Sequence, residues 1–208
     1  MRLLIIVAIA GLLAFSAAQA YISNDIAKTE QQPYKVLWKH GELEGRFYPQ
    51  ALMASFTNSA KEYKTSSSAG FRVLAGYIFG GNGDQKSIAM TAPVHMNFSD
   101  SGSTMSFVMP AEIDLKSLPK PNNDDIRFLE TEAQYVVAIR FGGWANDEKI
   151  AENATKLVNL LHSKGIEISS EPWYMGYNPP YQLINRRNEV AIKLTKEKMQ
   201  LLNSAAAH

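Results

Sequence analysis

Histidine, carboxylate and hydroxyl groups are the side chains of this sequence best suited to chemistry, but their spacing does not match a catalytic motif. The four histidines, at positions 40, 95, 162 and 208, are too scattered to place two imidazoles on one helix face. No Gly-x-Ser-x-Gly elbow or His-Glu-x-x-His helix occurs. Hydrolysis normally needs a nucleophile with a positioned base, or an open metal site. The pattern therefore favours binding over catalysis.

Two further classes of chemistry are disfavoured by composition and by one glycine-rich stretch. The chain has no cysteine, which excludes disulfide bonds, zinc–thiolate sites and Cys-x-x-Cys redox chemistry. Residues 80–87 superficially resemble a phosphate-binding loop, but Gln85 stands where a glycine must precede Lys86. A helix rather than a strand is also expected before this stretch. Nucleotide binding is therefore not indicated.

Methionine and aromatic side chains are the more informative residues of this sequence. Methionine packs adaptably and aromatic rings offer flat faces, so such residues could line a pocket for a planar ligand. They could equally fill the core, and the sequence leaves both interpretations open. The set comprises Met90, Met96, Met105, Met109, Met175, Trp144, Trp173, Tyr174 and Tyr177.

The first half of the chain predicts strands, a helix and then two more strands. The first β-like runs cover residues 35–39, 43–48 and 51–56. Ser59-Ala-Lys-Glu62 has the spacing of a capping box, so a helix should follow, with apolar residues at helical spacing up to Ile78. Weak helix formers at residues 65–68 are expected to delay its regular part. The strands after it are predicted at residues 87–98 and 104–109.

After an exposed connection at residues 111–125, the second half repeats this order. Its helix, Asn146 to Lys164, is predicted by an apolar stripe, by acidic residues in the first turn and by Gly165 beyond its end. The surrounding strands are expected at residues 126–130, 135–141, 173–184 and 189–194. This internal duplication predicts an α+β fold in which two antiparallel sheet units lie side by side with two helices packed on them. A concave apolar surface between the halves would suit a ligand.

The ends of the chain are expected to lie outside the folded domain, residues 33–195. Residues 1–20 are typical of a signal peptide, with Arg2, an apolar run over residues 3–15 and the small-x-small site Ala18-Gln19-Ala20. A membrane anchor is the alternative, but the run is shorter than the ~20 apolar residues of a spanning helix. Residues 21–32 are predicted to be a flexible lead-in. The tail, residues 196–208, is expected to carry a helical cap over residues 196–202.

Net charge limits the partners that we expect. The chain has 21 Lys and Arg against 20 Asp and Glu, and Arg2 is the only charged residue before position 21, so a mature chain would be neutral. Nucleic acids and anionic membrane surfaces attract excess positive charge. We therefore expect no nucleic-acid partner and no stable membrane insertion after signal cleavage. The sequence does not indicate protein partners.

Five strings resemble the SOUL/haem-binding protein family, in order and spacing, over roughly residues 34–194. They are Ile88-Ala-Met-Thr-Ala-Pro-Val94, Met105-Ser-Phe-Val-Met-Pro110, Phe141-Gly-Gly-Trp144, Gly176-Tyr-Asn-Pro-Pro180 and Arg186-Arg-Asn-Glu-Val190. The resemblance implies a distorted antiparallel β-barrel, built from a duplicated strand–helix–strand unit with two flanking helices. It also implies that the ligand is haem b or another porphyrin.

The resemblance further suggests where haem would lie. The ring would need an apolar cleft and the two propionates would need cations, for which guanidinium groups are well suited. Arg186 and Arg187 have a structural alternative, which is pairing with Glu189 or with backbone carbonyls to fix a hairpin. The candidate haem-binding residues are Phe71, Arg72, Met90, His95, Met96 and Arg186.

An iron ligand is harder to assign. Some family members place a histidine within an early Glu-x-Arg-x-Tyr strand motif, whereas this chain has Phe47 within its version, residues 44–48. His95 is the candidate ligand in its place, because imidazole coordinates haem iron. Strand alternation, however, puts His95 on the face opposite Met96. His40 is a weaker candidate because it precedes a turn glycine.

Three functions are compatible with these observations. The leading hypothesis is non-enzymatic binding of haem or a related tetrapyrrole by an exported soluble domain, for carriage, buffering or sequestration. It would lie in the periplasm of a bacterium and be secreted by any other host. The alternatives are a general binding module for small amphipathic molecules, since the family's fold is similar to the effector-binding domains of bacterial regulators, and an enzyme that modifies tetrapyrroles.

Overall fold

The structure, a computed structural model, describes residues 28–205 together with residues 5, 7, 9, 11, 12, 15–19 and 21. The predicted signal peptide therefore lies partly outside the described residues, as do residues 206–208. Among the residues that are described, no helix is both long and apolar enough to cross a membrane.

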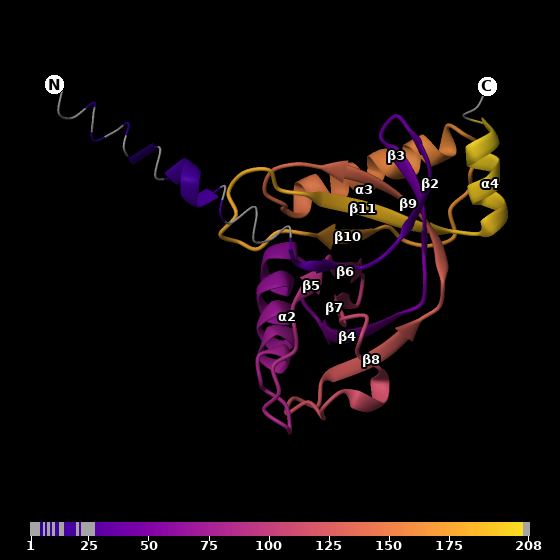
Figure 1. Ribbon diagram of the computed structural model, residues 1–208. Coiled ribbons are helices and arrows are strands. Elements are labelled where there is room, and N and C mark those ends of the chain that lie inside the picture. The colour runs from indigo at the N-terminus through magenta and orange to yellow at the C-terminus, as the bar shows by residue number, and fades with distance from the viewer. Residues whose placement is uncertain are drawn as a thin grey trace.

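Nine strands form one curled antiparallel sheet, and helices cover one of its faces (Figure 1). In spatial order the strands are β2 (Lys35–His40), β3 (Leu43–Tyr48), β9 (Gln134–Phe141), β11 (Asn188–Leu194), β10 (Trp173–Gly176), β6 (Val94–Ser99), β7 (Gly102–Val108), β4 (Ala51–Asn58) and β8 (Ile126–Thr131). Two short strands, β1 (Glu30–Gln31) and β5 (Thr91–Ala92), form a separate parallel pair. The helices are α2 (Tyr63–Ile78), α3 (Asp147–His162) and α4 (Lys196–Ala205), with a 3-10 turn, η1, at Leu115–Ser117.

The predicted duplication is visible in the strand order. The unit β4-α2-β6-β7 corresponds to β9-α3-β10-β11, and β6 pairs with β10 at the centre of the sheet. The outer strands are exchanged between the units: β3 precedes β4 in the chain but pairs with β9, whereas β8 precedes β9 but pairs with β4. The curled sheet ends at β2 and β8, which do not pair with each other, so it forms an open half-barrel rather than a closed barrel.

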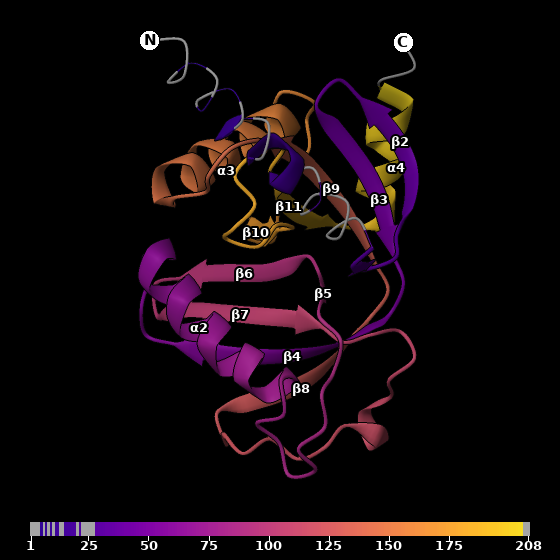
Figure 2. The same cartoon turned by 60° about the vertical axis from the view of Figure 1, so that its left-hand side comes forward.

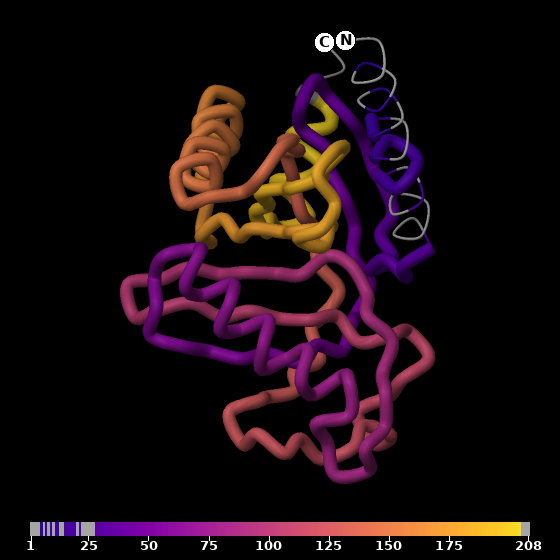
Figure 3. The backbone as a smooth tube through the Cα atoms, turned by 90° about the vertical axis from the view of Figure 1, so that its left-hand side faces the viewer, coloured from indigo at the N-terminus to yellow at the C-terminus, as the bar shows by residue number. Residues whose placement is uncertain are grey.

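Each unit has its own helix beside its part of the sheet, as Figures 2 and 3 show from two sides, and buried side chains fill the space between them. In the first unit, Leu74 and Ile78 of α2 pack against residues such as Met96, Met105 and Phe107. In the second, α3 and α4 pack against β9 and β11 through residues that include Leu157, Leu161, Val190, Ile192 and Met199. A smaller buried cluster on the opposite face of the sheet includes Tyr48, Val136, Ala138, Met175 and Ala191.

The start of α2 differs from the sequence prediction. The helix begins directly at Tyr63, and Glu62 at the N-cap position makes no side-chain cap. A side chain from the other unit supplies it, because Asp147 at the start of α3 accepts a hydrogen bond from the Tyr63 N–H at 2.5 Å. The predicted capping box is therefore wrong, and so is the expected delay over residues 65–68. A tertiary contact replaces the local one.

Several element boundaries also differ. The strand expected at 173–184 ends at Gly176, because Pro179 and Pro180 cannot donate to a ladder. The strand expected at residues 87–98 is divided at Pro93 into β5 (Thr91–Ala92) and β6 (Val94–Ser99). Within the predicted lead-in, β1 lies at Glu30–Gln31, and the next residue, Gln32, is buried and donates its N–H to the Ala92 carbonyl at 2.7 Å.

Candidate functional site

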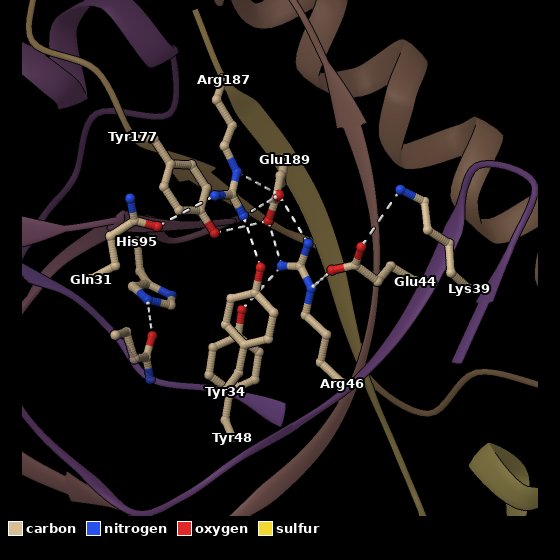
Figure 4. Close-up of polar contacts among 11 residues, drawn as sticks. Gln31, Tyr34, Lys39, Glu44, Arg46, Tyr48, His95, Tyr177, Arg187 and Glu189 are labelled. Atoms are coloured by element: carbon tan, nitrogen blue, oxygen red, sulfur yellow. Dashed lines mark hydrogen bonds and ion pairs between the residues drawn. The ribbon is translucent and has the colours of Figure 1, made fainter. Parts of the chain in front are cut away.

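A buried ion pair crosses the second half of the sheet (Figure 4). The Arg46 side chain of β3 donates to both carboxylate oxygens of Glu189 on β11, at 2.5 and 2.9 Å, and the two residues are 3% and 1% exposed. Burial alone would raise the pKa of Glu189, but the hydrogen bonds and charge of Arg46 outweigh burial and lower that pKa. Burial alone would lower the pKa of Arg46, but the hydrogen bonds and charge of Glu189 outweigh burial and raise that pKa. Both groups therefore remain ionised.

Arg187 and Tyr177 complete the coordination of Glu189. The Arg187 Nε donates to one carboxylate oxygen, and the Tyr177 hydroxyl donates to the other, both at 2.9 Å. The Arg187 guanidinium lies over the Tyr177 ring, 3.8 Å from its centre, and also donates to the Tyr34 hydroxyl at 3.1 Å. Burial, followed by the charge of Glu189, raises the pKa of Tyr177, so this hydroxyl stays protonated. The cluster fixes the beginning of β11.

His95 lies beside this cluster and is engaged by the segment before β2. Its Nε2 is 2.8 Å from the side-chain oxygen of Gln32, to which the neutral imidazole donates (Figure 4). Burial lowers the pKa of His95 to about 4, although the charge of Glu189 acts in the opposite direction. Coordination of iron by Nε2 would therefore require the hydrogen bond to Gln32 to break.

Arg186 holds the loop that joins β10 to β11, residues 177–187. Its guanidinium donates to three backbone carbonyls, those of Pro179, Gln182 and Asn178, at 2.8, 2.7 and 3.1 Å. Its other side faces Trp144, with the guanidinium carbon 4.2 Å from the ring centre. The structural alternative is therefore observed for both arginines, since Arg186 binds carbonyls and Arg187 binds Glu189.

Asn188 ties this loop to the one before α3. Its side-chain oxygen accepts from the Tyr174 hydroxyl at 2.7 Å, and its Nδ2 donates to the Gly143 carbonyl at 2.8 Å. The residue is 1% exposed. Because Asn188 is buried, breaking either hydrogen bond would leave one of its polar atoms without a partner. The two loops are therefore held at a fixed separation.

A pocket lies where these two loops meet. Its volume is about 590 Å³, and it is lined by Arg140, Phe141, Gly142, Gly143, Asn185 and Arg186. Ligand pockets in proteins typically span 300–1,000 Å³, so a molecule of substantial size could be held. Arg140 is exposed and makes no side-chain hydrogen bond or ion pair within the described residues. Its guanidinium can therefore bind an anionic group.

The duplicated units differ at this position. In the first unit β6 and β7 are joined by a tight turn, whereas in the second unit β10 and β11 are joined by residues 177–187. Two of the five strings that carry the family resemblance, Phe141–Trp144 and Arg186–Val190, supply residues that line the pocket, and a third, Gly176–Pro180, is hydrogen-bonded to Arg186. This convergence makes the pocket the candidate functional site.

The residues predicted from the sequence do not converge on one place. Arg186 lines the pocket, whereas Phe71 and Arg72 lie on α2, where Phe71 is paired with Phe107 at a ring distance of 5.6 Å. Met96 and Met90 belong to the core beneath α2. His95 has its side chain on the opposite face of β6 from Met96, in agreement with strand alternation.

Sequence reasoning missed Arg140, and it included Trp144 only among the side chains that could line a pocket or fill the core. The string Phe141-Gly-Gly-Trp144 was the available signal, because Arg140 immediately precedes it. Among the residues described, no group of three or more His, Cys, Asp or Glu side chains could hold a metal ion.

Comparison with known proteins identifies relatives along most of the chain. The model of the family described as SOUL heme-binding protein matches residues 29–193. Heme-binding protein 2 of Mus musculus and that of Homo sapiens are each 33% identical to this chain over 159 residues. The match covers 72% of this chain and 77% of each relative.

Solved structures share the fold at much lower identity. The C-terminal domain of EcmrR superposes with a TM-score of 0.55 at 12% identity, covering 78% of this chain and 98% of that domain. A hydrolase from Listeria innocua gives a TM-score of 0.53 at 9% identity, covering 76% and 94%. These likenesses concern the fold alone.

Proposed function

The chain belongs to the SOUL haem-binding protein family, and on this premise we propose that it binds haem or a related tetrapyrrole in the pocket between Phe141 and Arg186. The observation that carries this proposal is that two family strings line one pocket and that Arg186 ties a third string to it. The two relatives described above are named heme-binding proteins, which supports a binding role.

The residues of the pocket suit a planar molecule with carboxylates at its edge. One aromatic residue lines it, Phe141, whose ring also packs against both helix-covered cores, and the glycines at 142 and 143 let a flat ligand approach the backbone. Arg140 would bind a propionate, because its guanidinium can form two parallel hydrogen bonds with a carboxylate. Arg186 would contribute its position rather than its charge, since both of its Nη atoms donate to carbonyls of the loop.

Iron coordination by the protein is not needed for this proposal. No histidine lines the pocket, and Nε2 of His95 is bound to Gln32. Packing of the ring and the contact with Arg140 would then supply the affinity. A porphyrin without iron should bind nearly as well as hemin.

Titration of the chain from Tyr21 onward with hemin, and in parallel with an iron-free porphyrin, tests the proposal. We expect saturable binding of both, seen in the Soret band for hemin and in fluorescence for the porphyrin. Arg140→Gln should weaken both by about tenfold, because a hydrogen bond to a charged group contributes roughly 1.5–3 kcal/mol. Arg72→Gln is the matched control, since it removes an exposed arginine of α2. A linear, non-saturating response to both ligands would refute the proposal.

A finer part of the proposal concerns where the protein works and how. We propose that residues 1–20 direct export, and that the mature chain carries, buffers or sequesters its ligand without changing it. Mass spectrometry of the exported protein should find Tyr21 at its N-terminus. The haem complex, incubated with a reductant and oxygen, should keep its Soret band. Loss of the band with release of iron would instead indicate an enzyme.

A further inference from the structure

In the loop of residues 177–187, residues 181–184 bury a polar side chain and expose three apolar ones. Its polar residue Gln182 is 3% exposed; its side-chain oxygen accepts from Asn178 Nδ2 at 2.5 Å, and its Nε2 donates to the Ile184 carbonyl at 3.0 Å. Its apolar neighbours Tyr181, Leu183 and Ile184 are 61%, 44% and 49% exposed. In water the hydrophobic effect favours the reverse arrangement.

The loop cannot easily relax into that reverse arrangement. Arg186 binds three of its carbonyls, and the next residue, Arg187, is held by Glu189 in the buried cluster. The outward orientation of the apolar side chains is therefore built into the loop. Such a pre-organised surface loses little conformational entropy when it meets a partner.

A fourth apolar side chain extends the surface onto the neighbouring loop. Trp144 is 49% exposed and lies against Arg186, while Asn188 fixes the adjacent Gly143. We call Trp144, Tyr181, Leu183 and Ile184 the apolar rim. It borders the pocket, because Arg186 lines the pocket and Ile184 precedes Asn185, which also lines it.

Net charge alone predicts no stable membrane insertion, but from the exposure of these side chains we propose that the apolar rim makes a shallow contact with the surface of a lipid bilayer, so that the pocket opens toward the membrane. Trp and Tyr are the side chains enriched at membrane–water interfaces, and Leu and Ile favour the acyl region below. The mature chain is neutral, so apolar contact rather than attraction to anionic lipids would hold it there. The inference rests on the proposed function, since a tetrapyrrole is a largely apolar molecule that dissolves in bilayers.

The N-terminal segment supports the choice of a membrane over a protein partner. Gln19 is buried on the domain, and its side-chain oxygen accepts a hydrogen bond from the Leu183 N–H at 3.0 Å. Leu12 and Phe15, which precede it, are exposed. Where the residues before Gln19 lie in a membrane, this contact would therefore hold the loop of residues 177–187 next to the bilayer.

Flotation with vesicles of neutral phosphatidylcholine tests this inference without any haem. The chain from Tyr21 onward retains all strands and all three buried clusters. It should float with the vesicles, also in 0.5 M salt. Trp144 should be quenched by lipids brominated in their acyl chains, and Trp38, which is buried, should not.

A double substitution and a matched control decide whether the rim is responsible. Leu183→Ser/Ile184→Ser should lower the partition coefficient by about tenfold or more, because each large side chain loses most of its transfer free energy. Leu115→Ser/Leu129→Ser removes two leucines that are 44% and 55% exposed on η1 and β8, and it should float like wild type. Circular dichroism should show that both variants are folded.

Three outcomes would overturn the inference: wild-type protein that stays in the aqueous fraction, rim variants that float unchanged, or control variants that are impaired equally. Since no haem is present, failure of the hemin titration leaves these results unaffected. Conversely, saturable hemin binding without flotation would retain the proposed function and reject only the membrane contact.

Discussion

His95 should make the stability of this protein depend on pH well above the range in which carboxylates titrate. Its pKa falls from 6.5 in the unfolded chain to about 4 in the folded protein, chiefly because of burial. The folded state therefore binds fewer protons between these values, so the free energy of unfolding falls as the pH drops through 6.5. From the two pKa values, acidification from pH 8 to pH 5 should cost ~2 kcal/mol.

Urea unfolding at pH 8, 7, 6 and 5, followed by tryptophan fluorescence, measures this cost. His95→Gln should remove the dependence, because the amide keeps a donor near Gln32 but takes up no proton. The exposed His162 of α3 supplies the control His162→Gln, which should retain the wild-type slope. Glu189 does not interfere, since its lowered pKa places its own loss of stabilisation at lower pH. Parallel curves for wild type and His95→Gln would refute the reasoning.

Other substitutions test the packing and the ion pair. Glu189→Gln should destabilise the protein by up to about 3–5 kcal/mol in urea unfolding, because it removes the fully buried counter-charge and leaves Arg46 paired with Glu44 alone; no loss would show that water reaches the cluster. Gly45→Ala should cost about 1–3 kcal/mol in the melting curve, since the new Cβ would lie 2.3 Å from the buried Trp38 ring. Gly76→Ala on α2, where nothing lies within 4 Å, should instead stabilise by about 0.5–1 kcal/mol. Asn188→Leu should weaken hemin binding about tenfold by freeing Gly143 from the loop, and unchanged affinity would contradict its positioning role.

The order of elements was predictable because it depends on local periodicity. The stripe from Ile150 to Leu161 specifies α3, and the β-like run at residues 43–48 predicts β3 over the same residues as in the structure. The duplication followed from comparing the two halves. Asp147 as the cap of α2 could not be predicted in this way, because it is 84 residues from Tyr63 in sequence.

The candidate site was less predictable for two physical reasons. The Arg46–Glu189 pair joins residues 143 positions apart, and only the strand order brings them together. Residues 177–184 were predicted as the continuation of a strand. In the structure Gln182 is buried while Tyr181, Leu183 and Ile184 face outward, so the usual relation between hydropathy and burial is reversed at these four residues.

The exchange of β3 and β8 between the two units bears on how this chain arose and folds. A single unit expressed alone would have one unpaired sheet edge and one strand without a partner. Two copies could pair both by exchanging that strand. The present chain resembles such a swapped dimer joined end to end. Neither half can complete its sheet before the other is made, so folding depends on contacts between distant parts of the sequence and should be slow for a domain of this size.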